Sequence, residues 1–214
     1  MSSKKTRNRE AVEKQPQKAV KANVAPVPSP DRMRIIAALA VIAVITLVSY
    51  SNSFSGKFQF DDFHQIVENN FIRKLDIPRL FTDAQTATYE LGSKAYRPVT
   101  MTSFAVTYAI GGNNTAWFHA GNIKLHILNA FLLFFIVRNI AGRRGYGGLM
   151  MPLAAALVFA LHPVQTSAVT YISGRAMLLA SFFVLAGFYC FIRYRERETG
   201  GILWAAAASA CFAL

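Results

Sequence analysis

The sequence predicts an all-α protein, a bundle of helices that crosses a membrane several times. Of its 214 residues, 53% are hydrophobic and only 16% are charged, whereas a soluble domain usually has about 25% charged residues. The apolar residues are gathered in long runs, and the basic residues flank those runs. This distribution is typical of a polytopic membrane protein and excludes an ordinary soluble enzyme.

The formal net charge of +12 does not indicate a nucleic-acid partner. Nine of the 23 Lys and Arg residues lie within the first 34 residues, and most of the others border apolar runs. A basic tail ahead of membrane spans has this pattern. Cys190 and Cys211 both lie in apolar runs, which excludes a disulfide framework and a CxxC site. Walker and GxGxxG motifs are absent, so the usual nucleotide-binding loops are excluded as well.

The N-terminal region predicts a tail followed by a membrane anchor. Residues 1–31 are polar, basic and contain several prolines, so we expect a disordered cytoplasmic tail. Residues 33–50 form the first apolar run, which is slightly shorter than the roughly 20 residues that cross a bilayer. A signal peptide is the alternative to an uncleaved signal anchor. The long basic region before the run and the lack of a clear A-x-A cleavage site favour the anchor.

Residues 51–116 are predicted to form an outer loop with two helices lying on the membrane surface. The second helix would span residues 99–110, an apolar run that is too short to cross and stops at Gly111-Gly112. The first would lie within residues 51–97, where these apolar residues are spaced loosely like one helical face: Ile66, Phe71, Ile72, Leu75, Leu80 and Phe81.

Four further spans are predicted, at about residues 117–137, 149–163, 176–192 and 202–214. Trp117 begins the first of them, as interfacial aromatic residues do. The last run is too short, because a helix of its length reaches only about 20 Å at about 1.5 Å per residue. We therefore expect residues 32–214 to be the N-terminal part of a transmembrane domain that is truncated in its fifth span.

The basic residues predict the topology of this bundle. A cytoplasmic N-terminus places 15 of the 23 Lys and Arg residues on the cytoplasmic side, which satisfies the positive-inside rule. Residues 51–116 and 162–175 then face the outside or a lumen. The 15 comprise the nine near the N-terminus and six in two inner turns: Arg138, Arg143, Arg144, Arg193, Arg195 and Arg197.

Asp61 and Asp62 follow the first span by about ten residues. Two adjacent carboxylates at a membrane surface repel each other and are costly to desolvate. Neighbouring residues point about 100° apart on a helix, so they would not act as a symmetric pair. One could act as a base while the other orients a ligand or holds a cation. The alternative is a solvated acidic turn.

Arg97 and Arg175 are the candidate phosphate contacts. Arg97 precedes Pro98, which suits the first turn of a helix, and its fork of donors could bind a phosphate at headgroup height. The alternative is an anchoring arginine that snorkels to the interface. Arg175 would lie on the same side of the membrane as the two carboxylates. The alternative to a phosphate contact is that Arg175 is an interfacial arginine in a helix-capping turn. Together the two arginines and the acidic pair predict a site that binds an anionic lipid headgroup next to a base.

Polar residues also lie within the second span. His119, Asn122 and His126 are spaced i, i+3 and i+7, so they share one helical face, while Lys124 lies off it. That face predicts either hydrogen bonds between helices or a ligand site. His64 and His162 are the remaining histidines. Because no HxxxH or CxxC spacing is present, we expect no zinc site.

The order of these motifs resembles a known family. The series F-D-D-F-H, N-N, L-F-T, Y-R-P, F-H-x-x-N-x-x-x-H, H-P-V and S-G-R-x-x-L-L-A is similar to the membrane half of the transmembrane and tetratricopeptide-repeat O-mannosyltransferases and their bacterial relatives. More distantly, it resembles the protein O-mannosyltransferases. Both belong to the GT-C class of glycosyltransferases. The resemblance covers about residues 33–214.

The resemblance implies a bundle of many helices with two surface helices in its first outer loop. It implies a polyprenyl-phosphate sugar donor, carrying mannose or another hexose, and a protein Ser or Thr hydroxyl as acceptor, on the non-cytoplasmic face. In the distant relatives the first-loop acidic pair is Asp-Glu and its first member is the base. That role would fall on Asp61, with Asp62 as the supporting carboxylate, although the second residue departs from the pattern.

The remaining roles follow from the same resemblance. The donor phosphate would contact Arg97 and Arg175, and more weakly Lys124. Supporting polar residues would be His64, His119, Asn122, His126 and His162. Metal use varies across the class, so a divalent cation stays open. Later spans and a tetratricopeptide array are missing, so we do not expect these 214 residues alone to be active.

Two other functions remain open, and so does the identity of the membrane in which the protein lies. The first is a non-catalytic scaffold or lipid-binding subunit that kept the fold. The second is a transporter whose polar stripe lines a pathway, although no pair of broken helices supports it. The closer likeness to the short bacterial relatives favours a bacterial inner membrane over the endoplasmic reticulum.

Overall fold

The computed structural model describes residues 32–87, 96–196 and 201–213, and within these every regular element is helical. The all-α prediction is confirmed for this part of the chain, while the predicted tail at 1–31 lies outside the described residues. The longer elements are α1 (Arg32–Ser49), α2 (Ile77–Thr82), α3 (Pro98–Gly111), α4 (Thr115–Arg143), α5 (Met150–Leu161), α6 (Thr166–Thr170), α7 (Arg175–Arg195) and α8 (Ile202–Ala213). Short turns are η1 (Ser51–Ser55), η2 (Phe63–Val67), η3 (Asn70–Arg73), η4 (Ala84–Ala87), η5 (Pro163–Gln165) and η6 (Ile172–Gly174).

Three described helices are long and apolar enough to cross a membrane: Arg32–Ser49, Thr115–Arg143 and Ile172–Arg195. A fourth span is present if α5 and the following helix Pro163–Thr170, which are bent by 48°, count as one. These helices overlap the apolar runs at 33–50, 117–137, 149–163 and 176–192, whose exact span boundaries stay predictions. Helix α8 is apolar but shorter. The side of the membrane on which each end of these helices lies stays a prediction.

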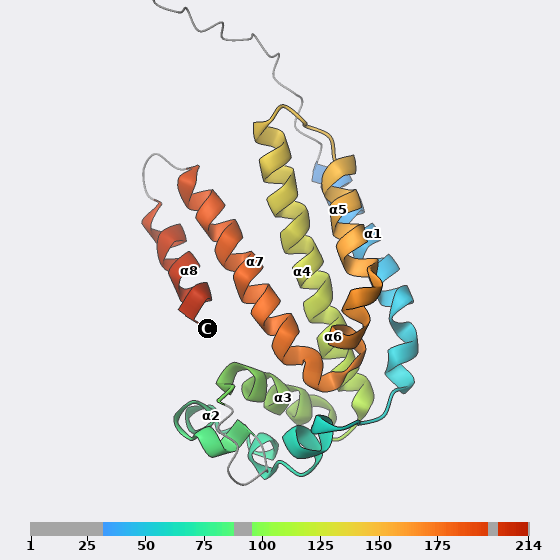
Figure 1. The fold of residues 1–214 in the computed structure, drawn as a ribbon, viewed down its shortest axis with the longest axis vertical. Helices are drawn as coiled ribbons and strands as arrows, with labels where there is room; N and C mark the ends of the chain where they lie inside the picture. The colour runs from blue at the N-terminus through green and yellow to red at the C-terminus, as the bar shows by residue number, and fades with distance from the viewer. Residues whose placement is uncertain (1–31, 88–95, 197–200, 214) are drawn as a thin grey trace, which may run out of the picture.

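The long helices lie side by side, with α4 in the middle (Figure 1). Helices α1 and α5 pack on one side of α4, α7 packs on the other, and α8 packs against α7. Small residues let α1, α4 and α5 approach closely, as is usual between membrane helices. The buried residues at this contact are Ala38, Ile42, Ala130, Phe134, Ala156 and Ala160.

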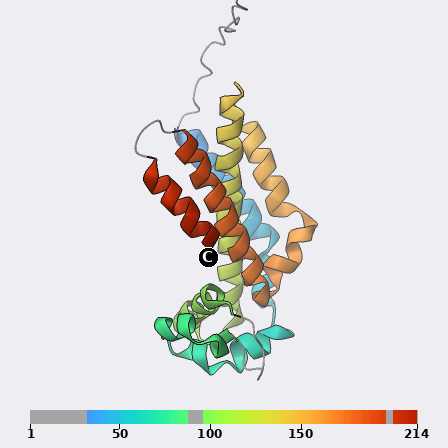
Figure 2. The ribbon, with the colours of Figure 1, turned by 60° about the vertical axis from the view of Figure 1, so that its left-hand side comes forward.

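The segment between α1 and α4 gathers at one end of the bundle, the lower end in Figures 1 and 2. One helix was expected within residues 51–97, but the described part forms separate short pieces, so this prediction was wrong. The side chains of Asn69 and Asp76 accept backbone N–H groups of Phe71 and Arg79 and start new helical turns. Such N-caps interrupt a continuous helix because they require non-helical backbone at the cap.

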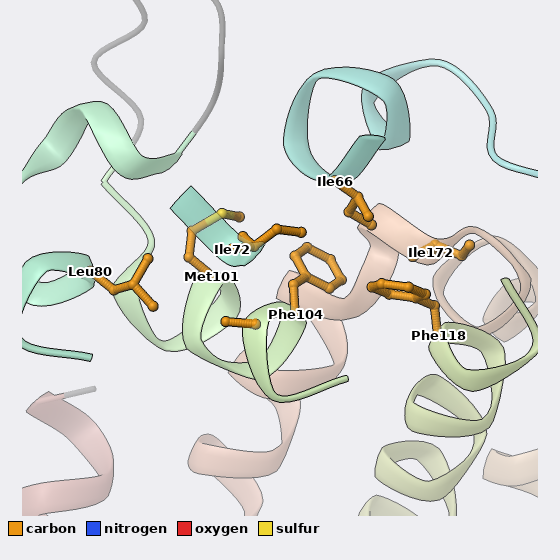
Figure 3. Packing of buried hydrophobic residues seen from close by; sticks show 8 residues of the cluster. Ile66, Ile72, Leu80, Met101, Phe104, Phe118 and Ile172 are labelled. Atoms are coloured by element: carbon orange, nitrogen blue, oxygen red, sulfur yellow. The ribbon is translucent and has the colours of Figure 1, made fainter. Parts of the chain in front are cut away.

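The apolar residues of that segment are nevertheless buried together (Figure 3). Ile66, Ile72 and Leu80 come from η2, η3 and α2, and they share one cluster with residues of α3, α4 and η6. The other members are Met101, Phe104, Ala105, Phe118 and Ile172. The cluster fixes the outer segment to the ends of α4 and α7. The second expected surface helix is α3, which has Pro98 in its first turn and ends before Gly112, at φ 57°.

Candidate active site

Asp62 is buried, with 1% of its surface exposed, and its carboxylate is fully hydrogen-bonded. Its Oδ1 accepts from the backbone N–H (2.9 Å) and the hydroxyl of Ser173. Its Oδ2 accepts from the backbone N–H of Gln59 (3.0 Å). Buried polar groups need hydrogen-bond partners of this kind, because burial without them is costly. Asp62 therefore joins the outer loop to the turn before α7, across 111 residues of sequence.

Asp61 lies next to this buried carboxylate, but its own side chain is exposed. Its carboxylate accepts no hydrogen bond from any residue that the structure describes, whereas its backbone N–H donates to the hydroxyl of Tyr171 (3.1 Å). The two carboxylates thus have different surroundings, as their adjacency predicts. An exposed carboxylate without a protein partner can accept a proton from a substrate hydroxyl.

Phe60 gives the turn before Asp61 an unusual backbone. Its φ of 44° is the one positive value among the described residues other than glycine, and its side chain is 80% exposed. Left-handed backbone at a bulky residue costs about 1–3 kcal/mol and persists where surrounding contacts enforce it. The bonds of Asp61 to Tyr171 and of Asp62 to Ser173 supply such contacts. The strained turn therefore presents Asp61 at the surface.

The sequence predicted that Arg175 contacts the donor phosphate. In the structure, its guanidinium donates hydrogen bonds to other residues of the protein instead. Arg175 is 1% exposed. Its Nε donates to the side chain of Asn122 (2.8 Å), and its Nη2 donates to the carbonyl of Phe118 (2.7 Å). Its Nη1 donates to the carbonyl of Ser103 (3.1 Å) and the hydroxyl of Thr107 (2.8 Å). Because α3 and α4 occupy these donors, Arg175 is a brace between three helices and not an exposed anion ligand.

Apolar packing completes this brace. The Arg175 guanidinium lies 4.6 Å from the ring centroid of Phe104 and 5.7 Å from that of Phe118. Such cation–π contacts are favourable where the charge is desolvated. A Cβ atom at Gly121 would lie 2.6 Å from Nη2 of Arg175, so a larger residue there would push the guanidinium away from its hydrogen-bond partners.

One short segment, residues 171–175, thus connects both aspartates to α3 and α4. Tyr171 and Ser173 bond to the two aspartates, and Arg175 bonds to α3 and α4. The side-chain amide of Asn122 donates to the carbonyl of Tyr171 (3.0 Å), so α4 also fixes this segment. Burial raises the pKa of the Tyr171 hydroxyl, which keeps it neutral. The sequence analysis missed Tyr171, since nothing in its local pattern marks a contact 110 residues away.

Arg97 is exposed at the start of α3, and its guanidinium contacts no described partner by hydrogen bond or ion pair. It lines a groove of about 260 Å³ between the start of α3 and the first half of α7. The wall on α7 is apolar, and it consists of Ala176, Leu179, Ala180 and Phe183. A cation that lines a groove with an apolar wall, and that has no described partner, suits an amphiphile with an anionic head.

Lys124 lies elsewhere. It is exposed and lines a separate, apolar groove of about 330 Å³ that is formed with residues of α1 and η1. The structure therefore brings Lys124 together with Leu47 and Phe54, and not with Arg97.

The predicted polar face of α4 is buried, and two of its members, Asn122 and His126, have separate hydrogen-bond partners. His126 donates from Nε2 to the carbonyl of Ala160 (3.0 Å), which also accepts from the Tyr50 hydroxyl (3.2 Å). These bonds satisfy a carbonyl at the bend before Pro163, whose missing N–H interrupts the helix. Asn122 belongs to the Arg175 network. The expectation of hydrogen bonds between helices is met by Asn122 and His126.

The other histidines are spread over the molecule. Neither ring nitrogen of His119 has a hydrogen-bond partner among the described residues, and its ring packs directly on Gly56. His64 lies at the surface, and its Nδ1 is within hydrogen-bond distance of the Glu68 carboxylate (3.1 Å). His162 accepts the N–H of Val164 at the start of η5 (3.2 Å). Within the described ranges no group of three His, Cys, Asp or Glu side chains could hold a metal ion.

Comparison with known proteins confirms the resemblance found in the sequence. The chain is 31% identical to protein O-mannosyl-transferase TMTC1 of Mus musculus over 183 residues, which is 83% of this chain and 19% of the relative. It is 32% identical to TMTC4 of Homo sapiens over 175 residues, 75% of this chain and 24% of the relative. A Caenorhabditis elegans protein O-mannosyl-transferase, F38B6.6, is 28% identical over 162 residues, 74% of this chain and 23% of the relative. No family model and no solved structure matches.

The chain spans about a fifth of the length of the curated relatives it matches. The similarity extends over most of this chain, so it includes more than one of the helices described above.

Proposed function

We propose that this chain, which is similar to the TMTC protein O-mannosyl-transferases, is the N-terminal part of a GT-C membrane glycosyltransferase. It would transfer mannose or another hexose from a polyprenyl-phosphate donor to Ser or Thr hydroxyls of proteins on the non-cytoplasmic face. The observation that supports this most is the unequal carboxylate pair. The carboxylate of Asp61 is exposed and has no partner among the described residues, beside a buried and hydrogen-bonded Asp62, in a chain similar to O-mannosyl-transferases.

In this proposal Asp61 is the base of the reaction. Its carboxylate takes the proton of the acceptor hydroxyl as the hydroxyl oxygen bonds to C1 of the sugar. The bond between C1 and the phosphate oxygen breaks, and polyprenyl phosphate leaves with the electron pair. The sugar phosphate is already activated, so the protein needs to supply a base and to stabilise the leaving phosphate.

Arg97 is the proposed contact to the donor phosphate. Its guanidinium is exposed and has no partner in the part of the chain that the structure describes, and the apolar wall of α7 in the same groove suits an isoprenoid chain. Arg175 has a different part in this proposal, because its donors are occupied. It is a positioning residue that holds α3, and with it Arg97, against α4 and α7.

The proposed topology has a cytoplasmic N-terminus and a non-cytoplasmic segment 51–116 that contains Asp61. The gathering of that segment at one end of the bundle supports a single face for the reaction (Figure 1). The bacterial inner membrane stays a prediction from the sequence, while the relatives named above come from animals. Fractionation of the source cells would decide between this membrane and the endoplasmic reticulum.

A non-catalytic scaffold is the alternative function. It is favoured by the bonds of Asp62 and Arg175, which are satisfied inside the protein and need no substrate. A scaffold would retain its partners and its fold after replacement of Asp61, with no change in the sugar content of any protein.

Comparison of exported proteins from cells tests the proposal. The complete reading frame and its Asp61→Asn variant are expressed in a host that lacks the gene, and exported proteins are compared by intact mass. We expect hexose additions with the wild type and none with Asp61→Asn. Asp76→Asn is a matched control, because Asp76 is an exposed N-cap in the same segment and asparagine caps equally well. Identical masses for folded wild type and Asp61→Asn would support the scaffold.

A further inference from the structure

A second groove lies at the end of the bundle away from Asp61. It has a volume of about 230 Å³ and is formed by the C-terminal turns of α4 and α7. These ends are at the top of Figure 1, opposite the segment that contains α2 and α3. The lining residues are Asn139, Ile140, Arg143, Phe188, Phe191, Ile192 and Arg195. None of them belongs to the candidate active site.

The charge around this groove is positive. Arg143 pairs with Glu196 (3.3 Å), and Arg193 pairs with the other oxygen of the same carboxylate (2.9 Å). Arg195 is exposed and forms no hydrogen bond or ion pair with any described residue. Two guanidinium groups therefore share one carboxylate, and the guanidinium of Arg195 adds a third positive charge, so the described residues around the groove carry more positive than negative charge.

The polar and apolar residues of the groove are separated along the helix axes, with arginines at the helix ends and apolar side chains further into the span. Arg143 and Arg195 are the last residues of α4 and α7. Phe188 and Phe191 lie one to two turns further into the span and are 44% and 48% exposed, and Ile140 is 41% exposed. Seven residues of helix cover about 10 Å, so the apolar wall continues from the headgroup level toward the acyl chains.

We propose that this groove binds an anionic phospholipid, with its phosphate at Arg195 and Arg143 and one acyl chain along Phe188 and Phe191. Basic pockets between spans at the ends of membrane helices recognise such headgroups. The lipid is a bound component of the fold, separate from the donor groove at Arg97. The proposal does not depend on the transferase activity, because it concerns the opposite end of the bundle.

Native mass spectrometry of the complete protein in mild detergent tests the proposal. The probes are phosphatidylglycerol and phosphatidylcholine of the same chain length. We expect wild type to retain one phosphatidylglycerol in preference to phosphatidylcholine. Arg195→Gln should weaken this binding by about fivefold, the effect of one basic side chain at a headgroup. Because Arg195 has no described hydrogen bond or ion pair, this variant should keep the wild-type unfolding temperature.

Arg144→Gln is the matched control. Arg144 is exposed and adjacent to Arg143, but it does not line the groove. Binding that falls equally in Arg144→Gln and Arg195→Gln would reflect general charge attraction and would overturn the proposal. Equal binding by wild type and Arg195→Gln would overturn it too. So would the absence of bound lipid in wild type, as expected if another part of the chain covers the groove. Phe191→Ala should weaken phosphatidylglycerol binding without a change in charge.

Discussion

The backbone N–H of Asp61 donates a hydrogen bond to the hydroxyl of Tyr171, which is 3.1 Å away and 110 residues later in the sequence. The same turn contains the strained backbone of Phe60. Tyr171 therefore stabilises the conformation that exposes the Asp61 carboxylate. The contact is made by the backbone of Asp61, so it leaves the side-chain carboxylate without a partner among the described residues.

Replacement of Tyr171 by Phe removes this acceptor and leaves the aromatic ring. One such hydrogen bond contributes about 0.5–1.5 kcal/mol, so we expect kcat for sugar transfer by the complete protein to fall by about threefold to tenfold, with little change in the KM for the acceptor. Steady-state kinetics with a Ser/Thr peptide would measure this. Tyr108→Phe is the control, because no described residue bonds to its hydroxyl. A wild-type rate in Tyr171→Phe would refute the positioning role.

Asp62→Asn should destabilise the protein, while Asp61→Asn should not. Asparagine has one side-chain oxygen, and its amide group would face N–H or O–H donors that now bond to the carboxylate. Leaving buried donors unsatisfied costs about 1–3 kcal/mol. Thermal unfolding of both variants in the same detergent provides the comparison. Equal unfolding temperatures for the two variants would contradict the division into a structural and an exposed carboxylate.

Gly121 and Gly142 of α4 provide a matched pair for the Arg175 brace. A Cβ at Gly121 would meet Nη2 of Arg175 at 2.6 Å, so Gly121→Ala should destabilise by about 1–3 kcal/mol through overpacking. A Cβ at Gly142 has nothing within 4 Å, so Gly142→Ala should be neutral or stabilising. Chemical or thermal unfolding measures both. A tolerated Gly121→Ala would mean that Arg175 is not held as described.

The ion pairs of Glu196 should give a pH-dependent contribution to stability. Burial acts to raise the pKa of Glu196, but donors from Asn139 and Arg143 and the charge of Arg193 outweigh it, so the pKa is below its usual 4.5. A lowered pKa in the folded state stabilises at pH above 4.5, and this stability is lost as the pH falls further. We expect Glu196→Gln to cost about 1 kcal/mol or less at pH 7.

The difference in stability between wild type and Glu196→Gln should shrink as the pH falls below the usual pKa of glutamate. Unfolding temperatures measured at neutral and acidic pH would detect this. A difference that is constant with pH would show that Glu196 acts through packing and not through its charge.

The long helices could be predicted from the sequence because their signals are local. Runs of apolar residues located α1, α4 and α7, and Gly111-Gly112 located the end of α3. The broken course of residues 51–87 was missed, since spacing alone suggested one helix and the caps at Asn69 and Asp76 were overlooked. Capping residues are local signals too, so these two breaks are marked in the sequence by Asn69 and Asp76.

The site was only partly predictable because its contacts are long-range. The motif positions pointed to Asp61, Asp62 and Arg97, all of which lie in the segment at one end of the bundle. Sequence spacing could not show that Arg175 is buried, or that Lys124 faces a different groove. Those facts depend on how α3, α4 and α7 pack, and a helical repeat within one element does not specify its neighbours.

The most direct test of the central claim is a transfer assay with the purified complete protein, a polyprenyl-phosphate mannose donor and a Ser/Thr peptide. We predict transfer by wild type and by Asp76→Asn, and loss of at least about a hundredfold in rate for Asp61→Asn, as expected for removal of a general base. The Asp61→Asn protein should unfold at the wild-type temperature. Wild-type rates in a folded Asp61→Asn protein would contradict the assignment of Asp61 as the base.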